Sequence, residues 1–472
     1  MGYDATIFTT QNRYVLLSSE IYGQSRMAKA AHSSFVSNTL PKVSHGQGCY
    51  VFDATGKSYI DGSGGPAVFS LGHSHPEVNE AIKQQLDRIA HGYRYTFTSD
   101  PLDELSDRIR AQAGPGLESL FYVSSGSEAM ESALKVALQY HWVRGDRNRT
   151  GFIARQRSYH GNTLGALSVS GFAQRRKHFE GSLIPCTFVS TANVYRPAID
   201  AGEDELTQFL ANELEHEILD QGAENIAAFI FEPVVGAAGG VIPAPRGYAR
   251  KIRDICDRYG VLMIADEVMC GSGRCGTWRA LEHDDNVLPD IMTLAKGLGG
   301  GYVPIAAVLY ANRVAEPIFD IDGGPNTGHT FTGHTLACAA AAKVQEIVQR
   351  DQLVDRVRQQ GPVLLTKLRD AIGDIEAVGD IRGRGHFVGI ELVADRDTRE
   401  PFDPELRLAD VLRARTLEAG LICYPVSGTV DGVSGDVAII APPYIAGEVE
   451  FNEITDKFTA SLKLALADIA AA

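Results

Sequence analysis

The stretch Asp290-Ile-Met-Thr-Leu-Ala-Lys-Gly-Leu-Gly-Gly-Gly301 decides how this sequence folds and what the fold can hold. Its apolar first half is typical of a buried strand, and that strand ends at Lys296 in front of a glycine-rich turn. A second apolar run, residues 261–265, ends in the same way at Asp266. The sequence therefore predicts two buried strands whose ends carry an amine and a carboxylate.

Apolar runs of the same kind recur between residues 119 and 310, with helical stretches such as 247–259 between some of them. The runs that we expect to form strands are residues 120–123, 151–154, 227–231, 261–265, 291–295 and 305–310. Continuous apolar runs bounded by turns are typical of strands that are buried on both faces. This part of the chain therefore predicts an α/β fold with a mostly parallel central sheet.

The C-terminal third has a different pattern. It predicts helices at residues 336–349 and 353–372, short strands at 387–392 and 437–440, and an amphipathic helix from residue 448. This is α+β character and indicates a second, smaller domain. A hairpin-like piece within residues 40–62 is expected to pack onto it. The predicted division is an N-terminal segment (1–65) packing with the small domain, a large domain (66–334) and the small domain (335–472).

Composition restricts the class of protein. The 472 residues are 44% hydrophobic and 22% charged, as in soluble globular proteins of two domains. A net charge of −15 argues against nonspecific binding to nucleic acid or anionic membranes. Seven scattered cysteines indicate reduced thiols and not a disulfide framework. With no signal sequence at Met1 and no apolar run of 18 residues, we expect a cytoplasmic protein.

The loop Ser124-Ser-Gly-Ser-Glu-Ala lies between a predicted strand and a predicted helix. Ser125 and Glu128 have the spacing of a capping box. Exposed N–H groups at a helix N-terminus, flanked by two hydroxyls, also form a cradle suited to a phosphate group. Taken alone, such a loop is more often an ordinary helix cap.

Lys296, Asp266 and this loop indicate a specific kind of site only when they are considered together. An amine that can form an imine, a carboxylate that can pair with a ring nitrogen, and a phosphate cradle are the parts of a pyridoxal phosphate site. A single lysine in a glycine-rich turn is usually a solvated charge, and a single strand-end aspartate is as often an ion-paired structural residue. Burial would lower the lysine pKa from about 10.4 and make it a better nucleophile.

Six motifs carry a resemblance to a known family. In chain order they are Ser125-Gly-Ser-Glu-Ala, Ser158-Tyr-His-Gly-Asn-Thr, Phe231-Glu-Pro-Val-Val-Gly-Ala, Ala265-Asp-Glu-Val, Thr293-Leu-Ala-Lys-Gly-Leu-Gly-Gly-Gly and His329-Thr-Phe-Thr-Gly-His. Together they resemble the class III (ω-type) aminotransferases, which are fold type I enzymes that depend on pyridoxal 5'-phosphate. The resemblance covers roughly residues 35 to 460 and implies the fold type I architecture for this chain.

The resemblance implies a role for each matching residue. Lys296 would carry the internal aldimine, a Schiff base, and Asp266 would pair with the pyridinium nitrogen. The remaining cofactor contacts implied are Ser125, Gly126 and Ser127 at the phosphate, Tyr159 and Val268 on the two faces of the ring, Glu232 near the ring, and Thr330 at the phosphate from the neighbouring subunit. Thr330 thus implies an obligate homodimer. His160 is expected to be structural.

The sequence departs from the family on the substrate side. Many ω-aminotransferases carry a mobile arginine shortly before the C-terminal Gly-Asp pair, where it clamps a carboxylate. Here no arginine or lysine lies between Arg415 and Lys457. Arg94 is a candidate replacement, with an ordinary surface arginine as the alternative. Residues 64–68 are small where relatives often place a bulky aromatic, so we expect a roomier pocket. His73 and His75 precede a helix and do not indicate a metal site.

The leading hypothesis is a pyridoxal-phosphate-dependent aminotransferase. It would move an amino group from an amine or ω-amino acid to a 2-oxo acid, such as pyruvate, in ping-pong half-reactions. Racemases, aminomutases and decarboxylases use the same scaffold, lysine and aspartate, so this second class stays open. A non-catalytic protein that binds the cofactor is the third hypothesis, and the intact set of Lys296, Asp266 and the phosphate loop argues against it.

Overall fold

The structure is a computed structural model that describes residues 40–471, and the residues from Ser44 onward form one compact unit. Most of the predicted N-terminal segment, and the start of the chain on which the prediction about a signal sequence rests, lie outside the described residues. The division at residues 65 and 334 stays a prediction. In the described part of the chain, no helix is both long and apolar enough to span a bilayer.

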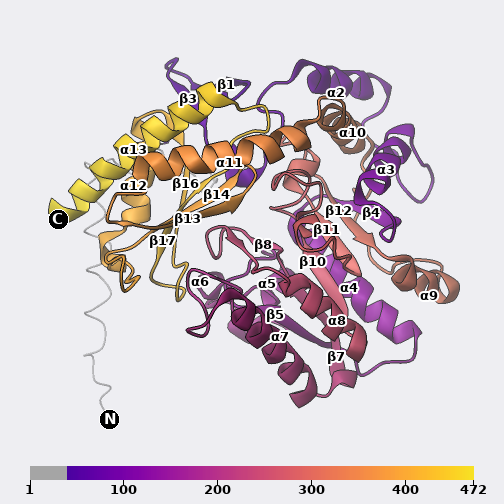
Figure 1. The fold of residues 1–472 in the computed structure, drawn as a ribbon. Helices are drawn as coiled ribbons and strands as arrows, with labels where there is room; N and C mark the ends of the chain where they lie inside the picture. The colour runs from indigo at the N-terminus through magenta and orange to yellow at the C-terminus, as the bar shows by residue number, and fades with distance from the viewer. Residues whose placement is uncertain (1–39, 472) are drawn as a thin grey trace, which may run out of the picture. The chain divides into compact units, whose positions relative to one another are not determined.

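A seven-stranded sheet forms the centre of the fold (Figure 1). Its strands, in spatial order, are β4 (Ser119–Val123), β12 (Ala306–Tyr310), β11 (Ile291–Leu294), β10 (Leu262–Asp266), β7 (Ile226–Phe231), β5 (Gly151–Arg155) and β6 (Thr187–Val189). Strands β11, β10, β7, β5 and β6 pair in parallel. Strand β12 runs antiparallel to both of its neighbours. The sheet is therefore mostly parallel, as the apolar runs predict.

Helices cover both faces of this sheet, which explains why its strands are apolar throughout. Along β7, Ala228 and Ile230 pack toward the alanine-rich α4, whereas Phe229 and Phe231 pack toward α7 and α8. The helices of the described chain are α1 (Gly64–Ala67), α2 (Pro76–Arg88), α3 (Asp100–Ala113), α4 (Gly126–Val143), α5 (Leu164–Ser168), α6 (Ala173–Arg176), α7 (Glu203–Asp220), α8 (Tyr248–Tyr259), α9 (Asn312–Asp322), α10 (Thr335–Arg350), α11 (Leu353–Ile372), α12 (Leu408–Glu418) and α13 (Glu448–Ala471).

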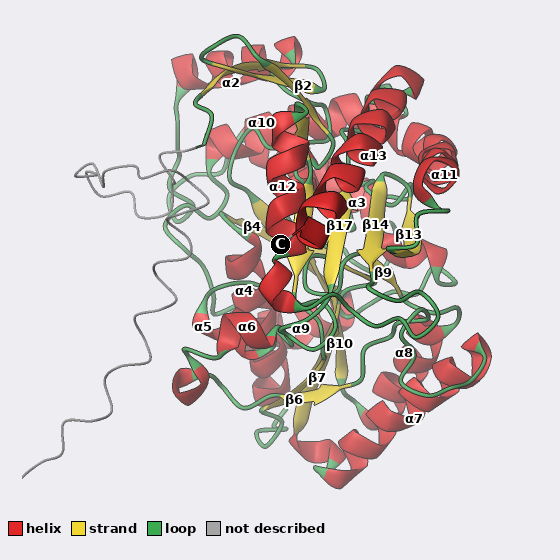
Figure 2. Cartoon of the chain, turned by 90° about the vertical axis from the view of Figure 1, so that its left-hand side faces the viewer, coloured by secondary structure: helices red, strands yellow, loops and turns green. Residues whose placement is uncertain are grey.

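A second sheet is built from the C-terminal third (Figure 2). It is antiparallel and runs in the order β13 (Val378–Arg384), β14 (Phe387–Leu392), β17 (Asp436–Ile440) and β16 (Tyr424–Ser427). Helices α11, α12 and α13 share one apolar core with it. This region is α+β, as the sequence predicts.

The hairpin predicted within residues 40–62 also contacts the C-terminal third. Strands β2 (Tyr50–Asp53) and β3 (Ser58–Asp61) are antiparallel, and β3 pairs in parallel with β15 (Leu421–Ile422). Strand β1 (Val43–Gln47) extends this sheet, and β8 (Val234–Val235) pairs with β9 (Ile242–Pro243). The pairing of β3 with β15 supports the predicted packing of this segment against the smaller domain.

Several strands were not predicted from the sequence, among them β6 and β13. Strand β6 has three residues, too few for an apolar run, and β13 alternates glycine with charged residues. Arg382 and Arg384 lie within β13. Arg382 bonds to Glu391 of the next strand at 2.6 Å and to main-chain carbonyls such as that of Gly240, so its charge is matched inside the protein.

Candidate active site

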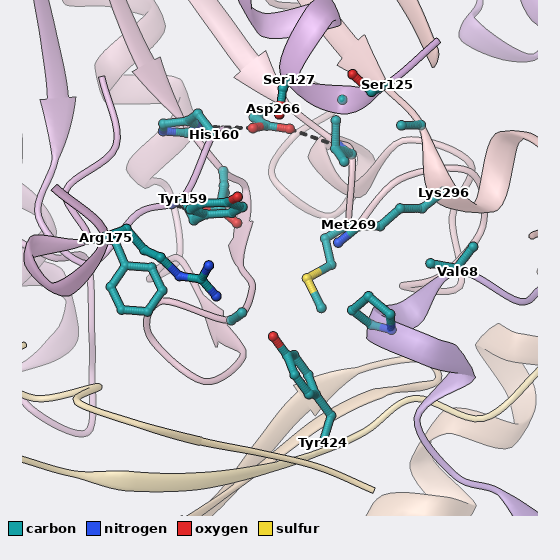
Figure 3. A pocket seen from close by; sticks show the side chains of 18 of the residues that line it. Val68, Ser125, Ser127, Tyr159, His160, Arg175, Asp266, Met269, Lys296 and Tyr424 are labelled. Atoms are coloured by element: carbon teal, nitrogen blue, oxygen red, sulfur yellow. Dashed lines mark hydrogen bonds and ion pairs between the residues drawn. The ribbon is translucent and has the colours of Figure 1, made fainter. Parts of the chain in front are cut away.

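A cavity of about 630 Å³ opens where the central strands end. Its walls come from the ends of β7, β10 and β11, the N-terminus of α4, the segment around α6, and strand β16 of the second sheet. Carboxyl ends of parallel strands are the usual ligand site of such sheets. Figure 3 shows the side chains of Lys296, Tyr159, Arg175 and Tyr424 around this common space.

Asp266 is the most firmly held side chain of the cavity. It lies at the end of β10 with 3% of its surface exposed. One carboxylate oxygen lies 2.8 Å from Nδ1 of His160, and the other accepts hydrogen bonds from the N–H of Val268 at 3.0 Å and the hydroxyl of Thr293 at 3.2 Å (Figure 3). Three donors hold the carboxylate in one orientation.

Lys296 begins a short 3-10 turn directly after β11. Its backbone has φ +46°, a left-handed conformation that costs a residue with a side chain about 1–3 kcal/mol and is typical of functional sites. Burial lowers the pKa of Lys296, and the charges of Asp266 and Glu232 oppose part of that shift. The amine pairs with no carboxylate among residues 40–471 and is directed into the cavity (Figure 3). It is therefore an amine poised to react.

The start of α4 forms the expected anion cradle. The Ser125 hydroxyl accepts a hydrogen bond from the N–H of Glu128 at 3.2 Å, which is half of the predicted capping box. The other half is different, because the Glu128 carboxylate accepts from the N–H of Ser124 and not of Ser125. Gly126 and Ser127 line the cavity, and as the first two residues of α4 their N–H groups have no partner within the helix. They can bind an anion there.

Glu232 and Tyr159 are tied to each other. Each oxygen of Glu232 accepts one backbone hydrogen bond, from the N–H of Tyr159 at 3.0 Å and from the N–H of Gly236 at 2.8 Å. Burial raises the pKa of Glu232. The Tyr159 ring meets Phe172 edge to face at 6.1 Å. Glu232 thus fixes the backbone that carries Tyr159, and the tyrosine ring forms one wall of the cavity.

These residues fit the group that the sequence predicts. The cradle has no spare room, since a Cβ added at Gly126 would lie 3.0 Å from Val268 and one at Gly161 would lie 2.7 Å from the Ser127 hydroxyl. Backbone can approach a phosphate closely only where such side chains are missing. A reactive amine, an anchored carboxylate and a phosphate cradle on one cavity are the donor set for pyridoxal 5'-phosphate.

Most of the predicted site residues meet in this cavity. Eight of the nine predicted cofactor contacts line it, namely Ser125, Gly126, Ser127, Tyr159, Glu232, Asp266, Val268 and Lys296. Thr330 and Arg94 are not among its lining residues. Thr330 is exposed. Arg94 donates to the Tyr95 hydroxyl at 2.7 Å and lies against the backbone of Gly328. Pro66 and Val68, from the small stretch 64–68, line the cavity, and its predicted roominess stays a prediction.

The comparisons with known proteins agree with this geometry. The family model described as aminotransferase class-III matches residues 32–462. The chain belongs to the class III aminotransferases. This aminotransferase is 40% identical to the uncharacterized aminotransferase YodT of Bacillus subtilis over 90% of its own length and 95% of that protein. It is 34% identical to gamma aminobutyrate transaminase 3 of Solanum lycopersicum, over 89% and 80% of the two chains.

Solved structures place the aminotransferase in fold type I. The omega transaminase of Pseudomonas jessenii in complex with PMP superposes with a TM-score of 0.86 at 32% identity, over 91% of this chain and 94% of that one. An (S)-enantioselective omega-transaminase of Thermomicrobium roseum gives 0.84 at 32% identity, over 91% and 93%. The predicted family and fold class are therefore confirmed.

His160 and Arg175 also line the cavity, and neither was predicted as a cofactor or substrate contact. His160, which was expected to be structural, makes the shortest hydrogen bond to Asp266. The only signal in the sequence is its place beside Tyr159, because the aspartate is far away in the chain. Arg175 lines the cavity from α6, in a stretch with no motif to mark it. His73, by contrast, pairs with Asp61 at 2.9 Å.

Proposed function

We propose that this class III aminotransferase binds pyridoxal 5'-phosphate and transfers an amino group from an amine or ω-amino acid to a 2-oxo acid such as pyruvate. The observation that carries the proposal is the meeting, on one cavity, of three groups: the amine of Lys296, which pairs with no carboxylate in residues 40–471, the anchored carboxylate of Asp266 and the N-terminus of α4. When bound, the cofactor supplies an aldehyde with which amines condense and a ring that withdraws electrons from the substrate carbon.

Asp266 and Lys296 would divide the proton chemistry. The Asp266 carboxylate would keep a proton on the ring nitrogen of the cofactor, because a nearby negative charge stabilises the cationic ring. Burial lowers the pKa of Lys296, so a larger fraction of its amine is neutral near pH 7. Nζ of Lys296 can then take a proton from the substrate carbon and return it. Such general acid-base help contributes about a hundred- to ten-thousandfold in rate.

The other cavity residues would hold the cofactor in place. The N–H groups of Gly126 and Ser127 and the two serine hydroxyls of the loop would bind the phosphate. Tyr159 and Val268 line the cavity and would contact the two faces of the ring. Glu232 would act through Tyr159, since it accepts the hydrogen bond from the N–H of that residue.

We further propose that the enzyme is a homodimer in which Thr330 reaches the partner's phosphate. Thr330 is exposed and does not line the cavity of its own chain. Around it, the segments 91–97 and 328–334 contact each other and expose four aromatic rings. Their exposed fractions are 48% for Tyr93, 73% for Tyr95, 66% for Phe97 and 55% for Phe331. An apolar patch of this kind is typical of a protein interface.

Mixed dimers test the shared site. Neither Lys296→Ala nor Thr330→Ala protein should be fully active alone. A dimer of one chain of each type would hold one complete site, with Lys296 from one chain and Thr330 from the other. Co-refolded mixtures should therefore be several times more active than the sum of the two separate proteins. Activity that only equals that sum would refute a role for Thr330 across the interface.

The transfer itself is tested by absorbance and product analysis. Purified protein loaded with the cofactor should show a visible band that shifts when an amino donor is added without acceptor, and the donor's carbonyl product, an aldehyde or a ketone, should appear at once. That order is expected for two half-reactions, in which the first product leaves before the acceptor binds. Lys296→Ala should lose the turnover, whereas Lys177→Ala, an exposed lysine outside the cavity, should keep it. Wild-type rates from Lys296→Ala would refute the proposal.

A further inference from the structure

Arg175 and Arg413 line the cavity, and among the described residues only Arg413 has its charge matched. Arg413 donates to Asp410 at 2.6 Å and to the carbonyl of Pro425 at 2.7 Å. Arg175 makes no side-chain hydrogen bond and no ion pair with any residue in the described range 40–471. A guanidinium has five donors, so Arg175 brings a full set of unused donors to the cavity.

The surroundings of Arg175 hold it only weakly. Its guanidinium lies 5.9 Å from the centre of the Tyr159 ring and 5.8 Å from that of Phe172. Both distances are near the outer limit of a cation–π contact, about 6 Å. In Figure 3 the guanidinium is directed toward the space between Tyr159 and Tyr424. It is therefore free to turn to an anion that enters the cavity.

Arg175 also lies beside the loop that lacks the family's arginine. The loop before Asp436 packs directly on α6, since the Gln174 amide lies against the backbone of Gly428 and Ala173 lies against Gly432. Arg175 is the next residue of the same short helix. The cation of Arg175 thus faces the cavity from α6, and α6 lies next to the loop in which many relatives carry their arginine.

Other cations near the cavity are less suited to this task. Arg157 is half-buried against Gly432, interacts electrostatically with Asp431, and does not line the cavity. Arg94 also lies outside the lining of its own chain's cavity, so it could act only on a partner's site. Arg176 is occupied by the carbonyls of α5, such as that of Ser168.

We infer that Arg175 binds the carboxylate of the amino-acid donor and of the 2-oxo acid acceptor. This inference rests on the proposed transamination and adds the residue that selects carboxylate-bearing substrates. A guanidinium can hold a carboxylate through two parallel N–H···O bonds, which gives both binding energy and orientation. Substrates without a carboxylate would leave these donors to water.

The test compares matched substrates that differ only in the carboxylate. The donors are 4-aminobutyrate and butylamine, and the acceptors are pyruvate and acetone, so that a methyl group replaces the carboxylate in each pair. For each pair, kcat and KM are measured in wild type and in Arg175→Ala, Arg175→Lys, Lys177→Ala and Arg94→Ala. Lys177 supplies the control, because it removes one positive charge at the end of the same helix but does not line the cavity.

Wild type should prefer the carboxylate member of a pair, and Arg175→Ala should lower that preference about ten- to a hundredfold, as expected for hydrogen bonds to a charged group. The loss should lie mainly in KM, because the contact binds ground state and transition state alike. Arg175→Lys should recover part of it, and Lys177→Ala should keep the wild-type preference.

Three results would overturn the inference. These are a wild type without carboxylate preference, an Arg175→Ala protein whose preference is within threefold of wild type, and a loss seen in Arg94→Ala in place of Arg175→Ala. A wild type that performs no half-reaction with any donor refutes the proposed function itself. The two failures are distinguishable, because only the second abolishes the absorbance change in the unaltered enzyme.

Discussion

Replacing His160 by leucine should weaken cofactor binding without unfolding the protein. His160 is buried, and its Nδ1 makes the shortest of the three hydrogen bonds to Asp266, at 2.8 Å. Leucine fills a similar space but donates nothing. Asp266 would keep only the N–H of Val268 and the Thr293 hydroxyl, and it would gain freedom to turn away from the ring nitrogen of the cofactor.

The size of the effect follows from the charge and the burial of Asp266. A hydrogen bond to a charged group contributes about 1.5–3 kcal/mol, and each 1.4 kcal/mol is tenfold in an equilibrium constant. Asp266 is 3% exposed, so water cannot easily replace the lost donor. We therefore expect the dissociation constant for pyridoxal 5'-phosphate to rise about ten- to a hundredfold.

The stability of the cofactor-free protein should change much less. Nε2 of His160 is buried without a hydrogen-bond partner in the part of the chain that the structure describes. Leucine removes this unsatisfied atom, which offsets part of the bond lost on the other side of the ring. Titration of the apoprotein with cofactor, followed by absorbance, gives the affinity. Thermal unfolding of the same apoprotein gives the stability.

Asparagine at position 160 is the matched control. Its amide can place a donor close to the position of Nδ1, so His160→Asn should bind the cofactor within about threefold of wild type. If leucine and asparagine weaken binding equally, the donor is not what matters and the reasoning is wrong. The same holds if His160→Leu keeps wild-type affinity.

Two further substitutions probe burial and the anion cradle. Burial raises the pKa of Asp436 to about 6 from an ordinary 3.8, so the folded protein holds this proton to higher pH than the unfolded chain. The free energy of unfolding therefore falls as pH rises from about 4 to above 6, by up to about 3 kcal/mol. Asp436→Asn keeps the acceptor for the Ala409 N–H but cannot ionise, so it should remove most of that fall. Urea unfolding of both proteins at pH 5 and pH 8 measures the difference. Equal pH dependence in both proteins would contradict this. Gly126→Ala would add a Cβ 3.0 Å from Val268 in the cradle, and tight insertions cost about 1–3 kcal/mol. Cofactor affinity should therefore fall about five- to a hundredfold. The helix should stay folded, because alanine is a better helix former than glycine. Unchanged affinity by the same titration would show that the cradle has room to spare.

Apolar runs predict the central sheet well because its strands are buried on both faces. Strand β7 differs from its predicted range by one residue at its start, and β10 differs by one residue at each end. The direction of β12 could not be predicted, since an apolar run has the same pattern in either orientation. Strand β13 was missed because its arginines are neutralised by residues on other strands, such as Glu391. A charged residue in a sequence suggests an exposed position, but a partner elsewhere in the chain can allow that residue to lie inside the fold.

The site was predictable only where motifs carry it. Lys296, Asp266 and the Ser125 loop each follow a strand, so a rule about strand ends brings them together. The bond between His160 and Asp266 joins side chains 106 positions apart and has no local signature. Arg175 has none either, because a free arginine and a paired one look the same in a sequence. Thr330 stays a prediction, since its implied partner is another chain.

The missing arginine illustrates the limit of comparing motifs position by position. A carboxylate needs a guanidinium on the correct wall of the cavity, and it does not matter which segment of the chain supplies it. The loop at Gly428 and helix α6 contact each other, so a cation can move from one to the other with little change of position. An aminotransferase that lacks the arginine of the C-terminal loop need not have lost carboxylate recognition. Its cavity should first be searched for an arginine without a partner, and within residues 40–471 that arginine is Arg175.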